Sequence, residues 1–308
     1  MNNQYWGVYK NLEYDFLKLM NFIHIDDKQL FVYSSKIVEL ILRSAIEIES
    51  ITKDLYSLNG GIKIDYLKYD EDCLKHLNKK WNLEYKIVNI SCLNCFQTIR
   101  TLQPFLKNEL RSKGKGNTYS WNNAYQNIKH NRVEALKSFG NIKYLFEIMS
   151  ALFMLNIYYK NDIFELNKDD KGTNFPLNLG SELFSIKLHR WKGSEERLYL
   201  KNDDFQESIY FIKGTNVSHQ KQQQISKDFE IERIEILKNN NNIIQYFKNN
   251  PLNDEPLDFI KLRDIVGHNN MQNILSISYL KALKKHNIKP ENFLNIIEYE
   301  AILNKRPK

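Results

Sequence analysis

Apolar residues recur at three- and four-residue steps through much of the first 160 residues, and this period restricts the possible folds most. A helix repeats every 3.6 residues, so such spacing predicts one buried face on a long α-helix. Asp26-Asp27-Lys28-Gln29 predicts a capping-box start for this helix, and Asn59-Gly60-Gly61 predicts its end. The stripe consists of Ile37, Leu40, Ile41, Ser44, Ile48, Ile51 and Leu55.

Three further helices are expected before residue 160. One runs from about Cys92 to Leu110, and a second covers residues 121–132 with Ser120 as its N-cap. The third covers residues 141–159 and includes the longest apolar stretch, which is too short for a membrane span and contains Glu147 and Asn156. It is expected to be buried. Residues 1–160 are therefore predicted to form an antiparallel helical bundle.

The pattern changes at Asn161. Between Leu183 and Lys213 polar and apolar residues alternate, with Gly and Asp at the turns, which predicts a small antiparallel sheet. Helical spacing returns from Val217 and is broken at Pro251 and Pro256. The predicted fold is mainly α, with a helical bundle over 1–160, a β-rich segment over 161–215 and a helical region over 216–308.

Composition excludes several classes of protein. The chain carries 44 Lys and Arg against 37 Asp and Glu, a formal charge of +7, which suits a nucleic-acid partner but is also explained by solubility alone. Residues 1–10 lack a signal-peptide pattern, so a cytoplasmic protein without membrane contact is expected. Three cysteines do not make a disulfide framework, and reduced thiols are expected. No cofactor motif is evident.

The richest cluster of chemical groups lies at the end of the helix expected over residues 121–132. His130 shares a helix face with Asn127, and Lys129 and Arg132 flank it. An imidazole exchanges a proton near neutral pH, and neighbouring cations stabilise the charge that develops on a phosphate. The alternative is a solvated basic face. The preceding basic loop supplies further candidate phosphate contacts at Arg111, Lys113 and Lys115.

Two segments of the first 160 residues carry a resemblance to a known family. They are Leu42-Arg43-Ser44-Ala45-Ile46-Glu47-Ile48-Glu49 and, further on, Trp121, Tyr125 and Ile128-Lys129-His130-Asn131-Arg132. With these segments, residues 1–160 resemble the HEPN family of helical domains. The resemblance implies a metal-independent endoribonuclease of an antiviral defence or toxin system, in which the RNA 2′-hydroxyl attacks the adjacent phosphate. It also implies a homodimer and an antitoxin or other defence partner.

The family signature is an Arg followed a few residues later by a His. His130 matches its His, but no Arg precedes it at that distance, so the Arg role would pass to Arg132, Lys129 or a second chain. The alternative function is therefore a catalytically degenerate HEPN-like module that binds RNA or a partner protein. Arg263 and His268 match the signature literally and form a second candidate pair.

Two further sequence patterns give weaker indications of function. Gly267-His268, followed by Tyr279, resembles the Gly-His box of tyrosine recombinases, whose other boxes are not evident. The second is a zinc-ribbon-like spacing, although packed thiols in helices are the commoner outcome for such residues. The candidate zinc ligands are Cys73, His76, Cys92 and Cys95.

Overall fold

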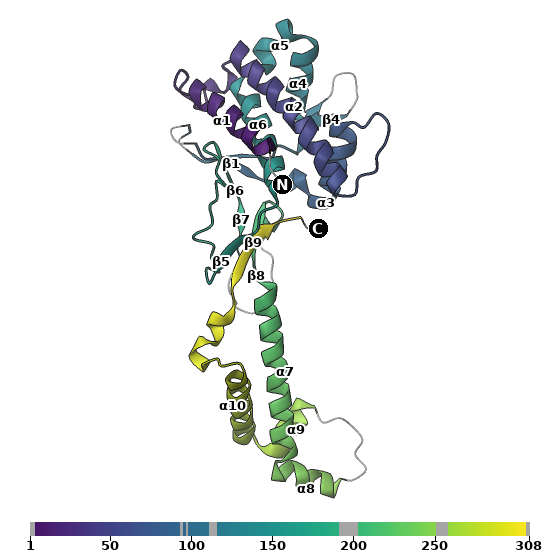
Figure 1. Ribbon diagram of the computed structural model, residues 1–308, viewed down its shortest axis with the longest axis vertical. Coiled ribbons are helices and arrows are strands. Elements are labelled where there is room, and N and C mark those ends of the chain that lie inside the picture. The colour runs from purple at the N-terminus through teal and green to yellow at the C-terminus, as the bar shows by residue number, and fades with distance from the viewer. Residues whose placement is uncertain are drawn as a thin grey trace. The chain divides into compact units, whose positions relative to one another are not determined.

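The computed structural model describes residues 4–92, 95–96, 98–110, 116–190, 203–250 and 258–305, in which helices dominate and short strands form small sheets (Figure 1). The helices are α1 Gln4–Leu19, α2 Ser35–Leu58, α3 Leu74–Trp81, α4 Ser120–His130, α5 Arg132–Phe139, α6 Ile142–Lys160, α7 Asn216–Lys238, α8 Asn241–Asn249, α9 Phe259–Val266 and α10 His268–Lys285. The strands are β1 Val88–Ile90, β2 Arg100–Leu102, β3 Lys107–Leu110, β4 Asn117–Tyr119, β5 Phe164–Asn167, β6 Phe184–Ile186, β7 Leu188–His189, β8 Tyr210–Gly214 and β9 Tyr299–Leu303.

The chain divides into two compact units. Unit 1 comprises Met1–Leu166, Asp170–Lys213 and Glu300–Lys308, and unit 2 comprises Asn167–Asp169 and Gly214–Tyr299. Unit 1 therefore contains both the helices before residue 160 and most of the segment that was expected to be β-rich. Each unit is described by itself below.

Helix α6 is the centre of unit 1. Of its 19 residues, 15 are buried, and it packs against α1, α2 and α4. A helix that is apolar on every side must be covered on every side, which is why the long amphipathic helix α2 lies against it. The prediction of a buried helix here is confirmed. Its N-cap is Asn141, whose Oδ1 accepts a hydrogen bond from the backbone N–H of Tyr144.

Helix α2 confirms the predicted apolar stripe but begins later than expected. Ser34, not Asp26 or Asp27, is its N-cap, because the Ser34 hydroxyl accepts a hydrogen bond from Ile37 N–H at 3.2 Å. Asp26 instead accepts from the backbone of Lys28 ahead of a short 3₁₀ turn. The helix ends at Asn59 as predicted, and Gly60 follows with φ +80°.

The prediction of a helix between Cys92 and Leu110 is wrong. Strands β2 and β3 occupy this stretch, because Pro104 cannot donate the hydrogen bond that a helix interior needs. Strand β9, near the C-terminus, was likewise expected to be helical. Its alternate residues Ala301 and Leu303 are buried, so it follows the two-residue period of a half-buried strand.

Within the residues that the structure describes, the strands form three small sheets, with strand orders β2-β1-β6, β3-β4 and β5-β9-β8-β7. Antiparallel pairing joins β1 to β2, β1 to β6 and β3 to β4, whereas the sequence predicted such pairing only among the strands between residues 183 and 213. Strands β7 and β8 instead pair in parallel, with Leu188 opposite Tyr210. Strand β6 was expected to pair within the later segment, but Phe184 lies opposite Ile90 of β1.

Unit 2 is built on an antiparallel pair of helices, α7 and α10. Thr215 caps α7 and Asp258 caps α9, in each case through a side-chain oxygen. Glu232 of α7 is buried and forms ion pairs with Lys285 at 2.7 Å and Lys281 at 3.4 Å on α10. The apolar core of unit 2 contains a cluster of five buried residues: Leu237, Ile243, Val266, Met271 and Ile274.

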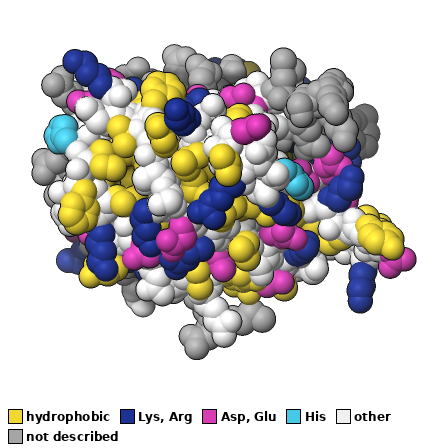
Figure 2. Space-filling view, turned by 90° about the horizontal axis from the view of Figure 1, so that it is seen from above, with side chains coloured by type: hydrophobic (Ala, Val, Ile, Leu, Met, Phe, Trp, Pro, Cys, Tyr) yellow, Lys and Arg dark blue, Asp and Glu magenta, His cyan; other side chains and the backbone are white. Residues whose placement is uncertain are grey.

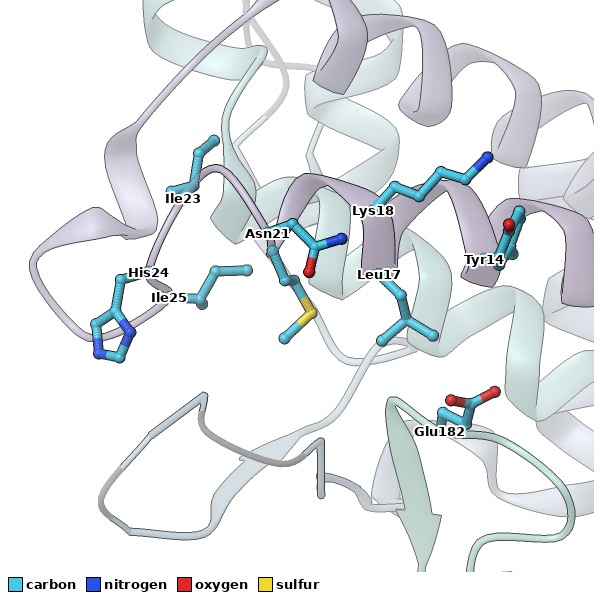
Figure 3. A pocket seen from close by; sticks show the side chains of 9 residues that line it. Tyr14, Leu17, Lys18, Asn21, Ile23, His24, Ile25 and Glu182 are labelled. Carbon is cyan, nitrogen blue, oxygen red and sulfur yellow. The ribbon is translucent and has the colours of Figure 1, made fainter.

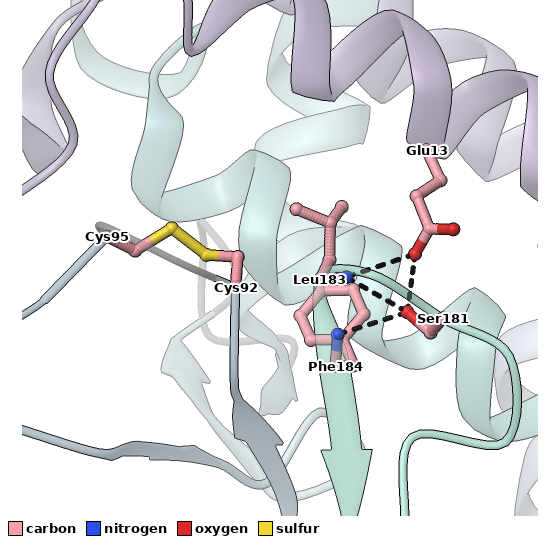
Figure 4. The surroundings of a disulfide bond; sticks show 6 residues. All are labelled: Glu13, Cys92, Cys95, Ser181, Leu183 and Phe184. Carbon is pink, nitrogen blue, oxygen red and sulfur yellow. Dashed lines mark hydrogen bonds between the residues drawn. A yellow bond between two sulfur atoms is a disulfide. The ribbon is translucent and has the colours of Figure 1, made fainter.

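A fully buried carboxylate joins α1 to the start of β6 in unit 1. The Oε1 atom of Glu13 accepts a hydrogen bond from the backbone N–H of Leu183 at 3.2 Å (Figure 4) and one from the backbone N–H of Glu182 at 2.9 Å. It also accepts from the hydroxyls of Tyr9 and Ser181, while Oε2 pairs with Lys10. Because every donor points at one buried charge, this network is expected to stabilise the charged carboxylate strongly.

We predict that Glu13→Gln lowers the free energy of unfolding by about 2–4 kcal/mol, because the amide keeps the shape but removes the charge that the donors surround. Urea titration followed by circular dichroism measures the loss. Glu182→Gln is the matched control: its side chain is 70% exposed, and a change within about 0.5 kcal/mol is expected. Equal losses in the two variants would contradict the role of Glu13.

Candidate functional site

The predicted catalytic residues lie where α4 meets α5, and we call Asn127, Lys129, His130 and Arg132 the α4–α5 corner. Helix α4 ends at His130, and α5 begins at Arg132. The backbone breaks at Asn131, whose φ of −146° is not helical and whose side chain donates to Glu134. Buried residues hold α4 against the core: Trp121, Ala124, Tyr125 and Ile128.

The side chains of this corner do not form a catalytic constellation. Lys129, His130 and Arg132 are exposed. The Asn127 amide donates to the Asn123 carbonyl oxygen at 2.8 Å and therefore does not orient His130. Within the described residues no hydrogen bond to the His130 ring and no ion pair to Lys129 or Arg132 is formed. The corner offers accessible donors and positive charge, and its imidazole has no positioning partner there.

The second candidate pair lies in unit 2. Arg263 is in α9, His268 is the first residue of α10, and Gly267 joins them with φ +88°. Arg263 approaches Asp264 at 3.5 Å, and a His268 ring nitrogen lies 3.1 Å from the Gln272 amide nitrogen. The literal Arg–His spacing therefore reflects a helix end followed by a new helix, and the two side chains have different partners. Arg111, Lys113 and Lys115 lie outside the described residues.

Two of the three cysteines, Cys92 and Cys95, are neither reduced thiols nor zinc ligands, so both of these predictions are wrong for them. Cys92 and Cys95 form a disulfide, with their Cα atoms 5.9 Å apart, so neither is a thiolate ligand (Figure 4). A His76 ring nitrogen lies 3.2 Å from the Asn59 carbonyl oxygen. Burial raises the pKa of the Cys73 thiol to about 11. No group of three metal-ligating side chains exists in the described ranges.

Two cavities in unit 1 adjoin, because Leu17 and Glu182 line both. The larger, about 620 Å³, lies beneath the last turns of α1 and residues 20–25, with Leu17 and Glu182 on opposite sides (Figure 3). Its polar groups are Lys18, Asn21, His24 and Glu182, and Lys18 Nζ lies 4.1 Å from the Tyr14 ring centroid. The smaller, about 380 Å³, is lined by Leu17, Ser91, Cys92, Asn178, Ser181 and Glu182.

Glu147 lines a third cavity of unit 1, of about 530 Å³, between α6 and β2. Burial raises the pKa of its carboxyl group, and its Oε2 atom makes no hydrogen bond within the described part of the chain. Lys143 Nζ lies 4.0 Å from Oε1. A carboxyl group with a raised pKa can exchange a proton closer to neutral pH. The sequence signal was present, since Glu147 interrupts the longest apolar stretch, but it carried no functional prediction.

Lys86 is a buried titratable group that sequence reasoning missed. Its side chain is fully buried, and its ammonium donates to the Gln206 carbonyl oxygen at 2.8 Å. Burial lowers the pKa of Lys86 from 10.5 to about 7. An amine with such a pKa is a nucleophile at neutral pH, but no described cavity is lined by Lys86, so we assign it a structural role.

No helix in the described residues is long and apolar enough to cross a membrane.

We predict that Lys86→Met raises the free energy of unfolding at pH 6, by an amount on the order of 2 kcal/mol, and has little effect above pH 10. Below pH 7 the folded protein must hold a buried charge, whereas between pH 7 and 10.5 only the unfolded chain keeps the proton, so wild-type stability rises with pH. Urea titrations at pH 6, 8 and 10 measure this, with the exposed Lys75→Met as control. A gain that does not shrink as the pH rises would contradict the explanation.

Comparison with known proteins gives no match: no family model, no curated protein and no solved structure is similar to this chain.

Proposed function

We propose that this protein is an RNA-binding module with a HEPN-like helical bundle in unit 1, acting in a defence or toxin system. The observation that carries the proposal is the exposure of Lys129, His130 and Arg132 at the α4–α5 corner. Exposed cations of this kind bind backbone phosphates without regard to sequence. The choice of RNA comes from the resemblance of residues 1–160 to HEPN domains.

Binding fits the geometry better than catalysis. A general acid or base needs a partner that fixes its orientation, and Asn127 is instead bonded to its own helix. On the face drawn in Figure 2, Lys and Arg side chains alternate with acidic and hydrophobic ones, so no broad basic patch is seen on that face. A small cationic corner, rather than a broad basic surface, is therefore the proposed contact with RNA.

We predict that Lys129→Gln/Arg132→Gln weakens binding of single-stranded RNA about tenfold. It should also lower the slope of log affinity against log salt by about 1.4, or about 0.7 for each lost phosphate contact. Fluorescence anisotropy at several salt concentrations measures both. The matched control is Lys75→Gln/Lys79→Gln, which removes two exposed charges from α3. If both double variants bind equally weakly, net charge and not the corner explains binding.

The second candidate is a metal-independent endoribonuclease completed by a second copy of the chain. The accessibility of His130 favours it, because a partner's cation can approach an exposed imidazole. Such a site would use His130 as acid or base, with Arg132 and Lys129 stabilising the developing charge.

A single assay distinguishes the RNA-binding module from the endoribonuclease. We expect cellular RNA to stay intact when it is incubated with the purified protein and EDTA, because no side chain of the described residues positions the His130 ring. Cleavage that persists in EDTA, disappears in His130→Ala and survives in His268→Ala would support the nuclease instead. Sedimentation at the assay concentration shows whether the cleaving species is a dimer.

A further inference from the structure

The Cys92–Cys95 disulfide is poorly placed to serve as a structural staple. It links residues three positions apart, inside the connection between β1 and β2, whose ends are already paired at Ile90 and Arg100. A disulfide stabilises a fold mainly by restricting the unfolded chain, and the restriction is small when the closed loop is short. Because the loop is short, the disulfide contributes little to stability, and a chemical role for it is considered next.

The two sulfur-bearing residues are not equivalent. Cys95 is buried, with 4% of its surface exposed, whereas Cys92 is half-buried and lines the 380 Å³ cavity with Ser91, Ser181 and Glu182. Figure 4 shows Cys92 as the half of the bridge nearer to Leu183 and Ser181. A thiol entering the cavity would therefore meet Cys92 and not Cys95. An accessible first cysteine and a sheltered second one is the arrangement that thiol–disulfide exchange requires.

The adjoining cavities also carry charges of both signs. Glu182 lies in both and is only loosely engaged, at 3.6 Å from Lys10. Lys18 and His24 line the larger cavity. A carboxylate suits an ammonium group, and the two basic residues suit a carboxylate. The cavities thus match a small peptide-like thiol that bears both kinds of group.

We propose that Cys92–Cys95 is a reversible redox site that reacts with a small zwitterionic thiol at Cys92. The incoming thiolate attacks the Cys92 sulfur, a mixed disulfide forms, and the Cys95 sulfur leaves as a thiolate that takes up a proton. A second thiolate then attacks the reagent sulfur of the mixed disulfide. It releases the oxidised reagent and the Cys92 thiolate, which is protonated in turn. Two electrons pass from two thiols to the protein disulfide, and the reverse sequence restores it.

The proposed redox site is independent of RNA binding. The site lies entirely in unit 1, and none of its residues belongs to the α4–α5 corner.

Glutathione is the probe for the test. Full-length protein is equilibrated in buffers of defined glutathione and glutathione disulfide, alkylated, and its modified cysteines are located by mass spectrometry. We expect Cys92 and Cys95 to change together between bridged and reduced forms. Cys73→Ser, which alters the buried free thiol, should leave the response unchanged. Cys92 and Cys95 remaining as two free thiols in oxidising buffer, or remaining bridged in reducing buffer, would overturn the proposal.

Single-cysteine variants test the direction of attack. Cys95→Ser should accumulate one glutathione on Cys92 when exposed to glutathione disulfide, whereas Cys92→Ser should accumulate at least tenfold less on the sheltered Cys95. Circular dichroism checks that both variants are folded. Equal labelling of the two cysteines in folded variants would contradict the proposed asymmetry.

The charged groups are tested without touching the cysteines. Lys18→Gln and Glu182→Gln should each slow reduction by glutathione about twofold to fivefold, the effect of losing one partly exposed ion pair. Reduction by 2-mercaptoethanol, whose attacking thiolate carries no ammonium or carboxylate group, should respond less than reduction by glutathione. Equal effects on the two reagents would show that the cavities do not select a zwitterionic thiol.

Discussion

The burial of α6 is the constraint on which the rest of unit 1 depends. Because 15 of its 19 residues are buried, neighbouring elements must cover it on all sides, and α1, α2 and α4 do so. Aromatic contacts complete the cover: Phe146 and Phe153 of α6 lie against Phe184 at the start of β6. The helical part and the first sheet therefore share one core, and β6 belongs with β1 although it follows α6 in sequence.

Covering an apolar helix leaves little room for polar groups, and those that remain are satisfied in different ways. Glu13 is surrounded by donors, so its charge is stabilised where it lies. Lys86 has one carbonyl partner, and burial lowers its pKa. Glu147 has an oxygen without a partner within the described residues, and burial raises its pKa. The stability of the fold should therefore respond to pH through Lys86 and Glu147, whose charged forms are the less favoured.

Local pattern predicted the elements whose partners are close in sequence or whose period is strong. Helices α2 and α6 were predicted because an apolar stripe or run specifies a buried helix without reference to its neighbour. Strands β2, β3 and β9 were missed, since strands of three to five residues are too short to show a clear period and owe their form to pairing with other strands. Strands β2 and β3 pair with neighbours in sequence, whereas β9 pairs with the distant β5 and β8. For the site, the sequence predicted the position of His130 at a helix end but not the bonding of Asn127 within its own helix. The disulfide was missed because an odd number of cysteines argued for reduced thiols.

The disulfide lies close in sequence to the Glu13 network, because Ser91, the residue before Cys92, and Glu13 both bond to the backbone of Leu183. The Leu183 carbonyl oxygen accepts a hydrogen bond from Ser91 N–H at 2.9 Å, next to Cys92, while Leu183 N–H donates to Glu13. A backbone hydrogen bond thus joins the end of β1 to the start of β6, and the buried charge of Glu13 anchors the start of β6. The Cys92–Cys95 bridge lies within the connection that follows β1 and does not link the two strands. A bridge that opened beside an anchored strand would change the lining of the cavity at Cys92 while the core beneath kept its packing. A redox site can be tolerated here because the charge of Glu13, not the sulfur bridge, fixes the strand.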